Sequence, residues 1–72
     1  MTQVRLTLRE WREKRALSMR ELAERSGVAL RTIWRLEHGE GYPYPSTRRK
    51  LAQALGVEPD QIVFLDRPPL HS

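Results

Sequence analysis

Apolar residues in this chain recur at spacings of three and four, the pattern of amphipathic helices, and local signals mark where helices start and stop. Thr7-Leu8-Arg9-Glu10 and Ser18-Met19-Arg20-Glu21 are capping boxes, in which the hydroxyl accepts a backbone amide three residues on and the glutamate reaches back. Gly27 follows the second box and suits a left-handed helix end. We therefore expect helices over residues 8–16 and 19–26.

Glycine and proline separate three further expected helices. Gly39 and Gly56 each follow a periodic segment, where a left-handed residue ends a helix. Pro43 and Pro45 exclude helix in the segment between, because proline lacks an amide donor and restricts the residue before it. Pro59 suits the first position of a helix. The third expected helix covers residues 30–38 and the fifth covers 59–63. Ser46 or Thr47 caps the fourth, which stops at Gly56.

The two ends of the chain carry a different pattern. Residues 2–8 and 62–65 are rich in β-branched and apolar side chains. Two interpretations stay open: the segments pair as a two-stranded ribbon, within one chain or between two, or they form a disordered arm and a loose tail. The pattern predicts an all-α, compact five-helix domain with short flexible or β-like termini. Its parts are an N-terminal arm (residues 1–7), the helical domain (8–63) and a C-terminal tail (64–72).

Length and composition limit the class of protein. A chain of 72 residues forms one small domain that buries about 60% of its unfolded surface. The absence of cysteine excludes disulfides and thiolate zinc sites, so stability has to come from packing or oligomerisation. The longest apolar run, Ile62–Leu65, is too short to span a bilayer, and residues 1–5 lack the apolar region of a secretory signal. We expect a soluble cytoplasmic protein, associated with the nucleoid and not with a membrane.

Charge is distributed unevenly along the chain. The net charge is +4 and the isoelectric point is near 10.3. Residues 1–57 carry 12 basic and 6 acidic side chains, whereas residues 58–72 carry one basic and three acidic ones. A basic body suits a polyanionic partner and a slightly acidic tail suits something else, although a solvated surface explains the same balance equally well.

The second and third expected helices carry the most informative spacing. Leu22-Ala23 is followed after three residues by Gly27-Val28, after four more by Ile33 and after two more by Leu36. Two helices that meet at a steep angle approach closely near the bend, where a small residue such as Ala23 fits, and the tight turn needs the positive φ of Gly27. The larger apolar residues close the wedge between the helices. The spacing predicts a helix-turn-helix.

Further stretches extend this match to one known family. They are Leu17-Ser18-x-x-Glu21-Leu22-Ala23, Gly27-Val28, Thr32-Ile33-x-Arg35-Leu36-Glu37-x-Gly39, Pro43 and Leu51-Ala52-x-Ala54-Leu55-Gly56-Val57. With them, residues 8–63 resemble the Cro and phage-repressor type of helix-turn-helix domain, the XRE family, which implies a five-helix DNA-binding fold. The chain departs from the family at Met19, where members often have a phosphate-contacting glutamine, and at Ala29, where serine or threonine usually caps the third helix.

A helical wheel at about 100° per residue gives the third expected helix two different sides. Ile33 and Leu36 point together toward the core. Arginine can donate two hydrogen bonds to guanine O6 and N7, so a helix with arginines on its outer side suits the major groove. We expect Arg31 and Arg35 to read base edges there. The outer side consists of Leu30, Arg31, Trp34, Arg35 and His38.

Each outer residue also has an alternative role. Arg35 could bind phosphate alone, and Trp34 could contact a sugar-phosphate group, a thymine methyl, a partner protein or the edge of the core. His38 suits a cap of the helix dipole at the C-terminal end, and with His71 alone in the tail it makes no metal site. The predicted base-reading residues are Leu30, Arg31, Trp34 and Arg35, of which the resemblance supplies all but Trp34.

Contacts to phosphate are expected at the edges of the helix-turn-helix, because tyrosine hydroxyls, arginines and helix N-terminal amides bind phosphate. The alternatives are a solvated helix face for the arginines of the fourth helix and core packing for the tyrosines. The resemblance also implies a structural salt bridge between Arg12 and Glu37, partly buried between the first and third helices. The predicted phosphate contacts are Arg20, Tyr42, Tyr44, Arg48 and Arg49.

The size of the chain bears on its assembly. A compact chain of this length has a radius of gyration of about 11 Å, and we expect it to be narrower than the roughly 34 Å between successive half-sites on one face of DNA. One copy would then read one half-site. We therefore expect a homodimer on a near-palindromic operator, formed through the fourth and fifth helices and Ile62–Leu65. Phe64 and Leu65 look unpaired near a terminus, and packing onto the helical core is the alternative for them.

Our hypothesis is a sequence-specific double-stranded DNA-binding transcriptional regulator, a repressor or autoregulator, that reads the major groove with residues 30–38. The alternative is an antitoxin or adaptor that binds its operator through the helix-turn-helix and a protein partner through the C-terminal tail. An enzyme is not expected, because the sequence has no nucleophile–base pairing, no phosphate-binding glycine loop and no metal cluster. No cofactor is expected either.

Overall fold

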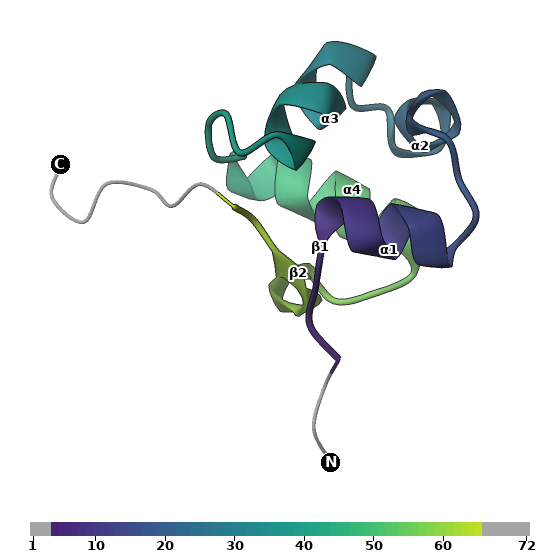
Figure 1. The fold of residues 1–72 in the computed structure, drawn as a ribbon, viewed down its shortest axis with the longest axis vertical. Coiled ribbons are helices and arrows are strands. Elements are labelled where there is room, and N and C mark those ends of the chain that lie inside the picture. Colours follow the sequence, from purple (N-terminus) through teal and green to yellow (C-terminus); the bar gives the residue numbers. More distant parts are fainter. Residues whose placement is uncertain (1–3, 66–72) are drawn as a thin grey trace, which may run out of the picture.

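The computed structural model describes residues 4–65, which form four α-helices, one 3-10 turn and a pair of two-residue strands (Figure 1). In chain order the elements are β1 (Leu6–Thr7), α1 (Leu8–Lys14), α2 (Met19–Ser26), α3 (Leu30–Glu37), α4 (Pro45–Leu55), the 3-10 turn η1 (Pro59–Gln61) and β2 (Ile62–Val63).

Both predicted capping boxes are present, and they start α1 and α2. Thr7 Oγ1 accepts the amide of Glu10 at 3.2 Å, and Glu10 Oε1 accepts the amide of Thr7 at 2.9 Å. Ser18 and Glu21 make the same two hydrogen bonds at 3.0 and 2.8 Å. Two hydrogen bonds with Ser18 lower the pKa of Glu21 below its ordinary value. The bond from the Ser18 backbone amide has the larger effect, and the bond with the Ser18 side chain has the smaller one.

The end of α1 comes earlier than predicted. The helix stops at Lys14 because Ala16 takes up the left-handed conformation, with φ 57°. The amide of Ala16 donates to the carbonyl of Glu13, and the amide of Leu17 donates to the carbonyl of Arg12, both at 3.0 Å. These two bonds form a Schellman motif, in which alanine occupies the position that glycine usually holds.

The start of α4 corrects the prediction that Ser46 or Thr47 caps the fourth helix. The helix begins at Pro45, and the residue before it, Tyr44, makes no capping hydrogen bond with its side chain. Proline at the first helical position has no amide to satisfy and already has a helical φ, so the helix starts without a hydroxyl cap. Its end at Gly56, with φ 74°, is as predicted.

The predicted fifth helix over residues 59–63 is also wrong. A single 3-10 turn forms instead, closed by hydrogen bonds of 2.9 Å from the Glu58 amide to Gln61 Oε1 and from the Gln61 amide to the Glu58 carbonyl. The chain then continues as β2. Within the described residues the five-helix expectation becomes four α-helices and one 3-10 turn.

The ribbon between the two ends of the domain is the interpretation that the structure supports. β1 and β2 pair in parallel within one chain, with Leu6 opposite Ile62. Trp11 Nε1 donates to the carbonyl of Gln61 at 2.8 Å, and Gln61 Nε2 donates to the carbonyl of Val4 at 3.1 Å. The ribbon and these bonds tie the beginning of the described chain and α1 to the segment after α4. They add a small β element to an otherwise helical fold.

The core extends one residue into the predicted tail. Phe64 is 9% exposed and packs with the helices, whereas Val63 and Leu65 are 39% and 56% exposed. Residues 1–3 of the predicted arm and 66–72 of the predicted tail, with His71, lie outside the described residues. The core consists of Leu8, Trp11, Leu17, Leu22, Val28, Ile33, Leu36, Leu51, Ala52, Leu55, Ile62 and Phe64.

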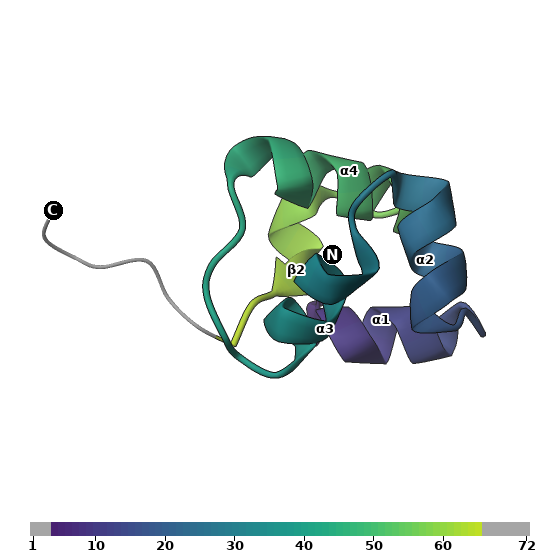
Figure 2. The ribbon, with the colours of Figure 1, turned by 90° about the horizontal axis from the view of Figure 1, so that it is seen from above.

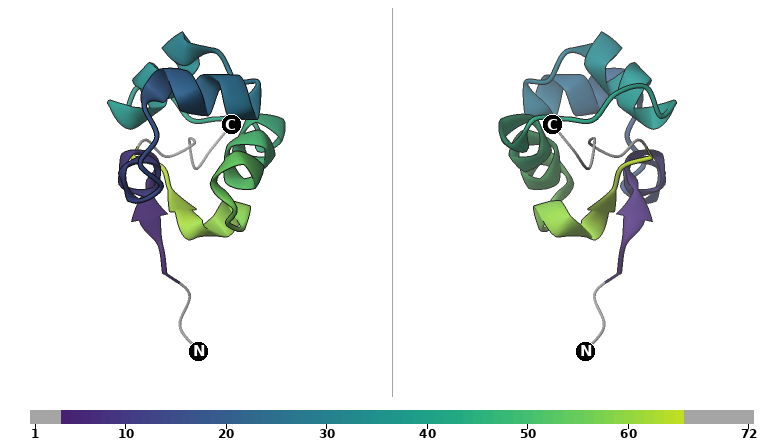
Figure 3. Two further views of the ribbon diagram at one scale, coloured as in Figure 1. Left: turned by 90° about the vertical axis from the view of Figure 1, so that its right-hand side faces the viewer. Right: turned by 90° about the vertical axis from the view of Figure 1, so that its left-hand side faces the viewer.

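The arrangement of the helices leaves one long side of α3 at the surface. Figures 1 and 3 show α2 and α3 on one side of the molecule and the strands on the opposite side, and Figure 2 shows α1 and α4 flanking α3. No helix within residues 4–65 has the length and apolar character needed to cross a membrane.

Candidate nucleic-acid interface

A tight turn joins α2 to α3, as the spacing predicts. Gly27 has φ 76°, and its amide donates to the carbonyl of Ala23 at 2.9 Å. The amide of Val28 donates to Ser26 Oγ at 3.1 Å, and the Val28 side chain is buried between the helices. Ala29, which precedes α3, makes no side-chain capping bond. The helix-turn-helix is therefore present, and α3 begins without a cap.

The exposed side of α3 carries all four residues that are predicted to read bases. Ile33 and Leu36 are 0% and 5% exposed and belong to the core. On the other side of the helix, Leu30 and Trp34 are 41% and 42% exposed. The two-sided character of α3 is thereby confirmed, while base reading stays a prediction. The exposed residues are Leu30, Arg31, Trp34 and Arg35.

The aromatic rings of Trp34 and His38 stack on this side. Their centroids are 3.8 Å apart, and the ring planes differ by 19°. His38 Nδ1 lies 2.7 Å from the carbonyl oxygen of Trp34. This hydrogen bond to one of the last carbonyls of the helix agrees with the capping role predicted for His38. The stack itself is a feature that the sequence analysis did not predict.

An acidic side chain stands next to Arg35 at the end of α3. The amide of Glu40 donates to the carbonyl of Arg35 at 2.8 Å, in a second Schellman motif around Gly39, whose φ is 74°. The backbone of Glu40 is therefore fixed, and its Oε1 lies 3.8 Å from Arg35 Nε. Both side chains are more than half exposed, so solvent weakens this ion pair.

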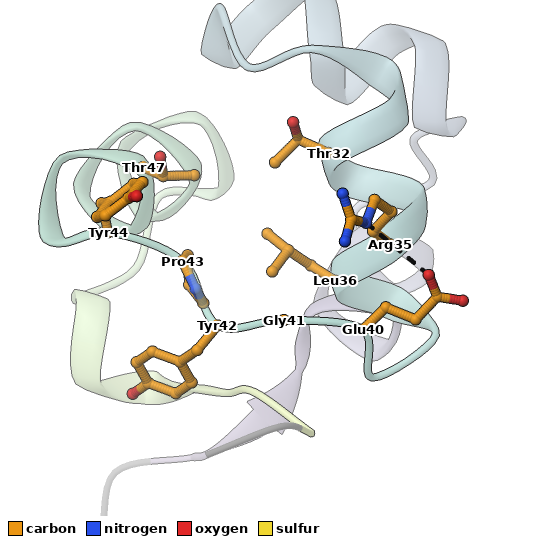
Figure 4. Close-up of a pocket in the computed structure, with 9 residues that line it drawn as sticks. All are labelled: Thr32, Arg35, Leu36, Glu40, Gly41, Tyr42, Pro43, Tyr44 and Thr47. Atoms are coloured by element: carbon orange, nitrogen blue, oxygen red, sulfur yellow. Dashed lines mark ion pairs between the residues drawn. The ribbon is translucent and has the colours of Figure 1, made fainter. Parts of the chain in front are cut away.

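A cavity of about 380 Å³ lies between α3 and the segment that leads into α4 (Figure 4). Thr32, Arg35 and Leu36 form its wall on the α3 side, while Tyr44 and Thr47 lie across from them. The predicted base reader Arg35 and the predicted phosphate contact Tyr44 thus border one hollow. Its polar groups are a guanidinium, hydroxyls and the Glu40 carboxylate, which repels a phosphate that enters.

The predicted phosphate contacts differ in their surroundings, and Tyr42 borders the first cavity as Tyr44 does. Arg20, in the first turn of α2, is exposed, and so is Tyr44 at 79%. Tyr42 packs edge-on against the Phe64 ring at a centroid distance of 5.7 Å, which agrees with the core-packing alternative, although 38% of it stays exposed. Arg48 is half-buried, and its Nε is buried without a hydrogen-bond partner among the described residues.

Arg49 lies apart from the hollow beside α3. It is exposed and borders a second cavity together with Gln53 and Glu58. None of the residues at this second cavity borders the first one. Arg48 borders neither cavity and is half-buried, whereas Arg49 is exposed, so the alternative of a solvated helix face suits Arg49.

The salt bridge between Arg12 and Glu37 is present and fixes the C-terminal end of α3 to α1. Arg12 Nε and Nη2 donate to the two Glu37 carboxylate oxygens at 2.7 and 3.0 Å, and Nη1 donates to the Leu17 carbonyl at 2.9 Å. The side chains are 14% and 3% exposed. The hydrogen bond to Glu37 raises the pKa of Arg12, so the guanidinium stays charged.

Comparison with known proteins identifies similar chains. Residues 8–62 match the protein family described as Helix-turn-helix. The chain is 41% identical over 58 residues to the HTH-type transcriptional repressor RghR of Bacillus subtilis, covering 79% of this chain and 43% of that protein. It is 39% identical over 62 residues to an uncharacterized HTH-type transcriptional regulator of Methanothermobacter thermautotrophicus, covering 86% and 90%.

A second Bacillus subtilis protein, the uncharacterized HTH-type transcriptional regulator RghRB, is 45% identical over 51 residues, covering 69% of this chain and 37% of that protein. The chain thus spans less than half the length of both Bacillus proteins. No solved structure gives a significant match.

Proposed function

The chain belongs to the helix-turn-helix family of the Cro and phage-repressor (XRE) type, and on that premise we propose that it is a sequence-specific transcriptional regulator that reads double-stranded DNA with α3. One relative is named a repressor and two are named regulators, which supports a repressor or autoregulator. The comparisons do not favour the alternative of an antitoxin or adaptor.

The observation that carries this proposal is the two-sided character of α3. Its inner residues are fully packed, while its outer side presents two arginines, an indole and a leucine to solvent. Arg31 is the second residue of the helix, in the part that helix-turn-helix proteins bring to base edges. A bidentate contact from Arg31 to guanine would contribute about 1–3 kcal/mol of discrimination.

Contacts to the DNA backbone complete the proposed mode of binding. Arg20 is exposed in the first turn of α2, and Tyr44 precedes α4 beside the hollow. Contacts of this kind set the register of the protein on the duplex without reading sequence. The full set predicted from the sequence is Arg20, Tyr42, Tyr44, Arg48 and Arg49, of which Arg49 suits the solvated-face alternative and Tyr42 also packs against Phe64.

We propose that two copies bind a near-palindromic operator. The reason is not the width of the chain, from which the sequence analysis argued. The radius of gyration, 11.6 Å, agrees with expectation, but the extents of 36 × 34 × 19 Å show that a single chain is not narrower than the spacing between half-sites. The expectation that the chain is narrower than this spacing is wrong. The stronger reason is that one copy offers one recognition helix of eight residues, about 12 Å long, which reaches a single half-site.

The proposed dimer surface does not include α3. It comprises α4, η1 and the exposed side chains of Val63 and Leu65, because Ile62 and Phe64 are occupied in the core. A protein partner at the C-terminal tail would bind mainly through residues 66–72, outside the described part of the chain.

Selection of bound duplexes from a random pool tests the proposal. Arg31→Ala should weaken binding to the selected duplex by about 5- to 150-fold and binding to a random duplex much less, both at one salt concentration. Arg20→Ala should weaken both alike, and Arg9→Ala on α1 serves as a charge-matched control. A pool that yields no preferred sequence, or an equal loss for Arg31→Ala on both duplexes, would contradict sequence reading by this residue.

A further inference from the structure

The stacked rings on α3 constrain each other more than a surface pair usually does. The imidazole of His38 lies over the indole of Trp34 at 3.8 Å, and its Nδ1 is 2.7 Å from the carbonyl oxygen of the same tryptophan. A carbonyl oxygen can only accept, so Nδ1 carries the hydrogen of this bond. The amide of His38 also donates to the Trp34 carbonyl, at 3.1 Å. Backbone and side chain of His38 therefore both hold to one residue.

This arrangement leaves the indole partly exposed. The ring of His38 covers one face of it, yet Trp34 keeps 42% of its surface exposed on the outer side of the helix. Leu30 and Arg31 lie one turn before Trp34 and are its neighbours on the helix surface. The outer side of α3 thus presents a leucine, a guanidinium and an indole next to one another. The stack with His38 orients the indole before any ligand binds.

The major groove offers one apolar group to such a surface, the C5-methyl group of thymine. The polar groups on base edges need donors or acceptors, and the Trp34 indole has a single N–H donor and no acceptor. Resting on the proposed function, we propose that Trp34 reads a thymine methyl group beside the base pair that Arg31 contacts. His38 is then the positioning residue that holds the indole for this contact.

A cap alone does not account for the geometry. Hydrogen bonding to the last carbonyls requires the Nδ1 atom but does not require the imidazole to lie parallel over an exposed ring. An indole that is already ordered loses less conformational freedom on binding than a free one, so the stack makes a weak apolar contact more effective. The proposal therefore predicts that the methyl contact of Trp34 requires an aromatic ring stacked on it from position 38 and does not require the hydrogen bond.

The experiment replaces each thymine of the selected duplex by uracil, one position at a time, which removes only the methyl group. Wild-type affinity should fall about fourfold at one position in each half-site, the factor that corresponds to one buried methyl group. Trp34→Ala and His38→Ala should bind thymine and uracil duplexes alike at that position. His38→Phe, which keeps an aromatic ring without the hydrogen bond, should restore the difference.

Two controls separate a positioning role from a change in folding. The free energy of unfolding is measured for each variant by urea denaturation, because loss of the cap alone lowers stability without removing the preference for thymine. Without DNA, acrylamide should quench Trp34 emission more strongly in His38→Ala than in the wild type, whereas Trp11 is 3% exposed and shielded in both. Unchanged quenching would show that His38 does not hold the indole and would overturn the proposal.

The outcomes on DNA distinguish this proposal from the function it rests on. If the wild type prefers its selected duplex but tolerates uracil at every thymine, sequence reading stands and the methyl contact is overturned. If His38→Phe behaves like His38→Ala while His38→Ala loses the methyl preference, the hydrogen bond and not the stack positions Trp34, which also overturns the proposal. If no duplex is preferred at all, the proposed function fails, and this inference fails with it.

Discussion

Replacing Glu37 by alanine removes one partner of the most buried ion pair among residues 4–65. Glu37 is 3% exposed and accepts two hydrogen bonds from Arg12, so the variant leaves a guanidinium with 14% exposure facing an apolar side chain. Loss of one partner of a buried pair costs about 3–5 kcal/mol. We expect the lower end, about 3 kcal/mol, because Arg12 keeps some solvent and its bond to the Leu17 carbonyl.

That loss is large for a domain of this size. At about 0.05–0.15 kcal/mol per residue, 72 residues give about 4–11 kcal/mol of total stability. With a urea dependence of about 1 kcal/mol per molar, the midpoint of unfolding should fall by about 3 M. Circular dichroism at the helix band follows the transition.

A matched control isolates the effect of burial. Arg9→Ala breaks the pair between Arg9 and Glu13, which has a similar distance of 3.1 Å but side chains that are 66% and 56% exposed. It should cost at most about 0.5 kcal/mol. The double variant Arg12→Met with Glu37→Leu should recover most of the stability lost in Glu37→Ala, because it leaves no unpaired charge. Equal shifts in Arg9→Ala and Glu37→Ala would refute the reasoning.

Three further predictions follow from local features of the structure. Ala16→Gly should raise stability by up to about 1 kcal/mol, since it relieves a left-handed alanine at a cost of about 0.5–1 kcal/mol in chain entropy; an unchanged or lower melting temperature would contradict this. Because the pKa of Glu21 is lower in the folded state, this residue stabilises the fold at pH values above its ordinary pKa of 4.5. The contribution is lost as the pH falls through the lower, folded-state pKa. Glu21→Gln, which keeps an oxygen acceptor for Ser18 but does not titrate, should therefore lose less stability than the wild type between pH 5 and pH 3 in urea titrations; an equal loss would exclude this residue as a source of acid sensitivity. Glu40→Gln removes the carboxylate beside Arg35 and should strengthen binding to random duplexes, with a steeper dependence of the dissociation constant on salt; identical salt slopes would show that Arg35 is not held back by this ion pair.

The elements that the sequence predicts correctly are those that local interactions determine. The capping boxes at Thr7 and Ser18 act over three residues, and the left-handed Gly27 and Gly56 end their helices by their own conformational freedom. The two-sided pattern of α3 follows from helical periodicity alone. Each of these signals lies within one or two turns of chain, which is why a single sequence reveals it.

The elements that the sequence leaves open, such as the strand at Ile62, or assigns wrongly, such as the fifth helix, depend on contacts between distant residues. Ile62 follows a 3-10 turn as a strand, and not as part of a helix, because its partner Leu6 lies 56 positions earlier and offers an unpaired backbone edge. Gln61 adds a bond to Val4 across the same gap. Phe64 looks like an unpaired residue near a terminus until the fold brings the helices and Tyr42 around it.

The candidate site divides in the same way. The outward side of α3 is evident from spacing, and the four-residue separation of Trp34 and His38 is a signal from which the stack could have been predicted. The approach of Glu40 to Arg35 has no such signal, because it depends on the left-handed Gly39 turning the chain back along α3. The difference in burial between Arg48 and Arg49 likewise depends on how α4 packs.

The two ends of α3 are held very differently, and this difference bears on its proposed role. At the C-terminal end, Glu37 is tied to α1, Gly39 forms a Schellman motif and His38 bonds back to the Trp34 carbonyl. At the N-terminal end Ala29 gives no cap. A helix anchored at its far end, with Ile33 and Leu36 in the core, can keep its first turn free of protein contacts without losing its orientation. That first turn holds Arg31, so in the proposed mode of binding the anchoring at the far end would give this arginine a rigid support.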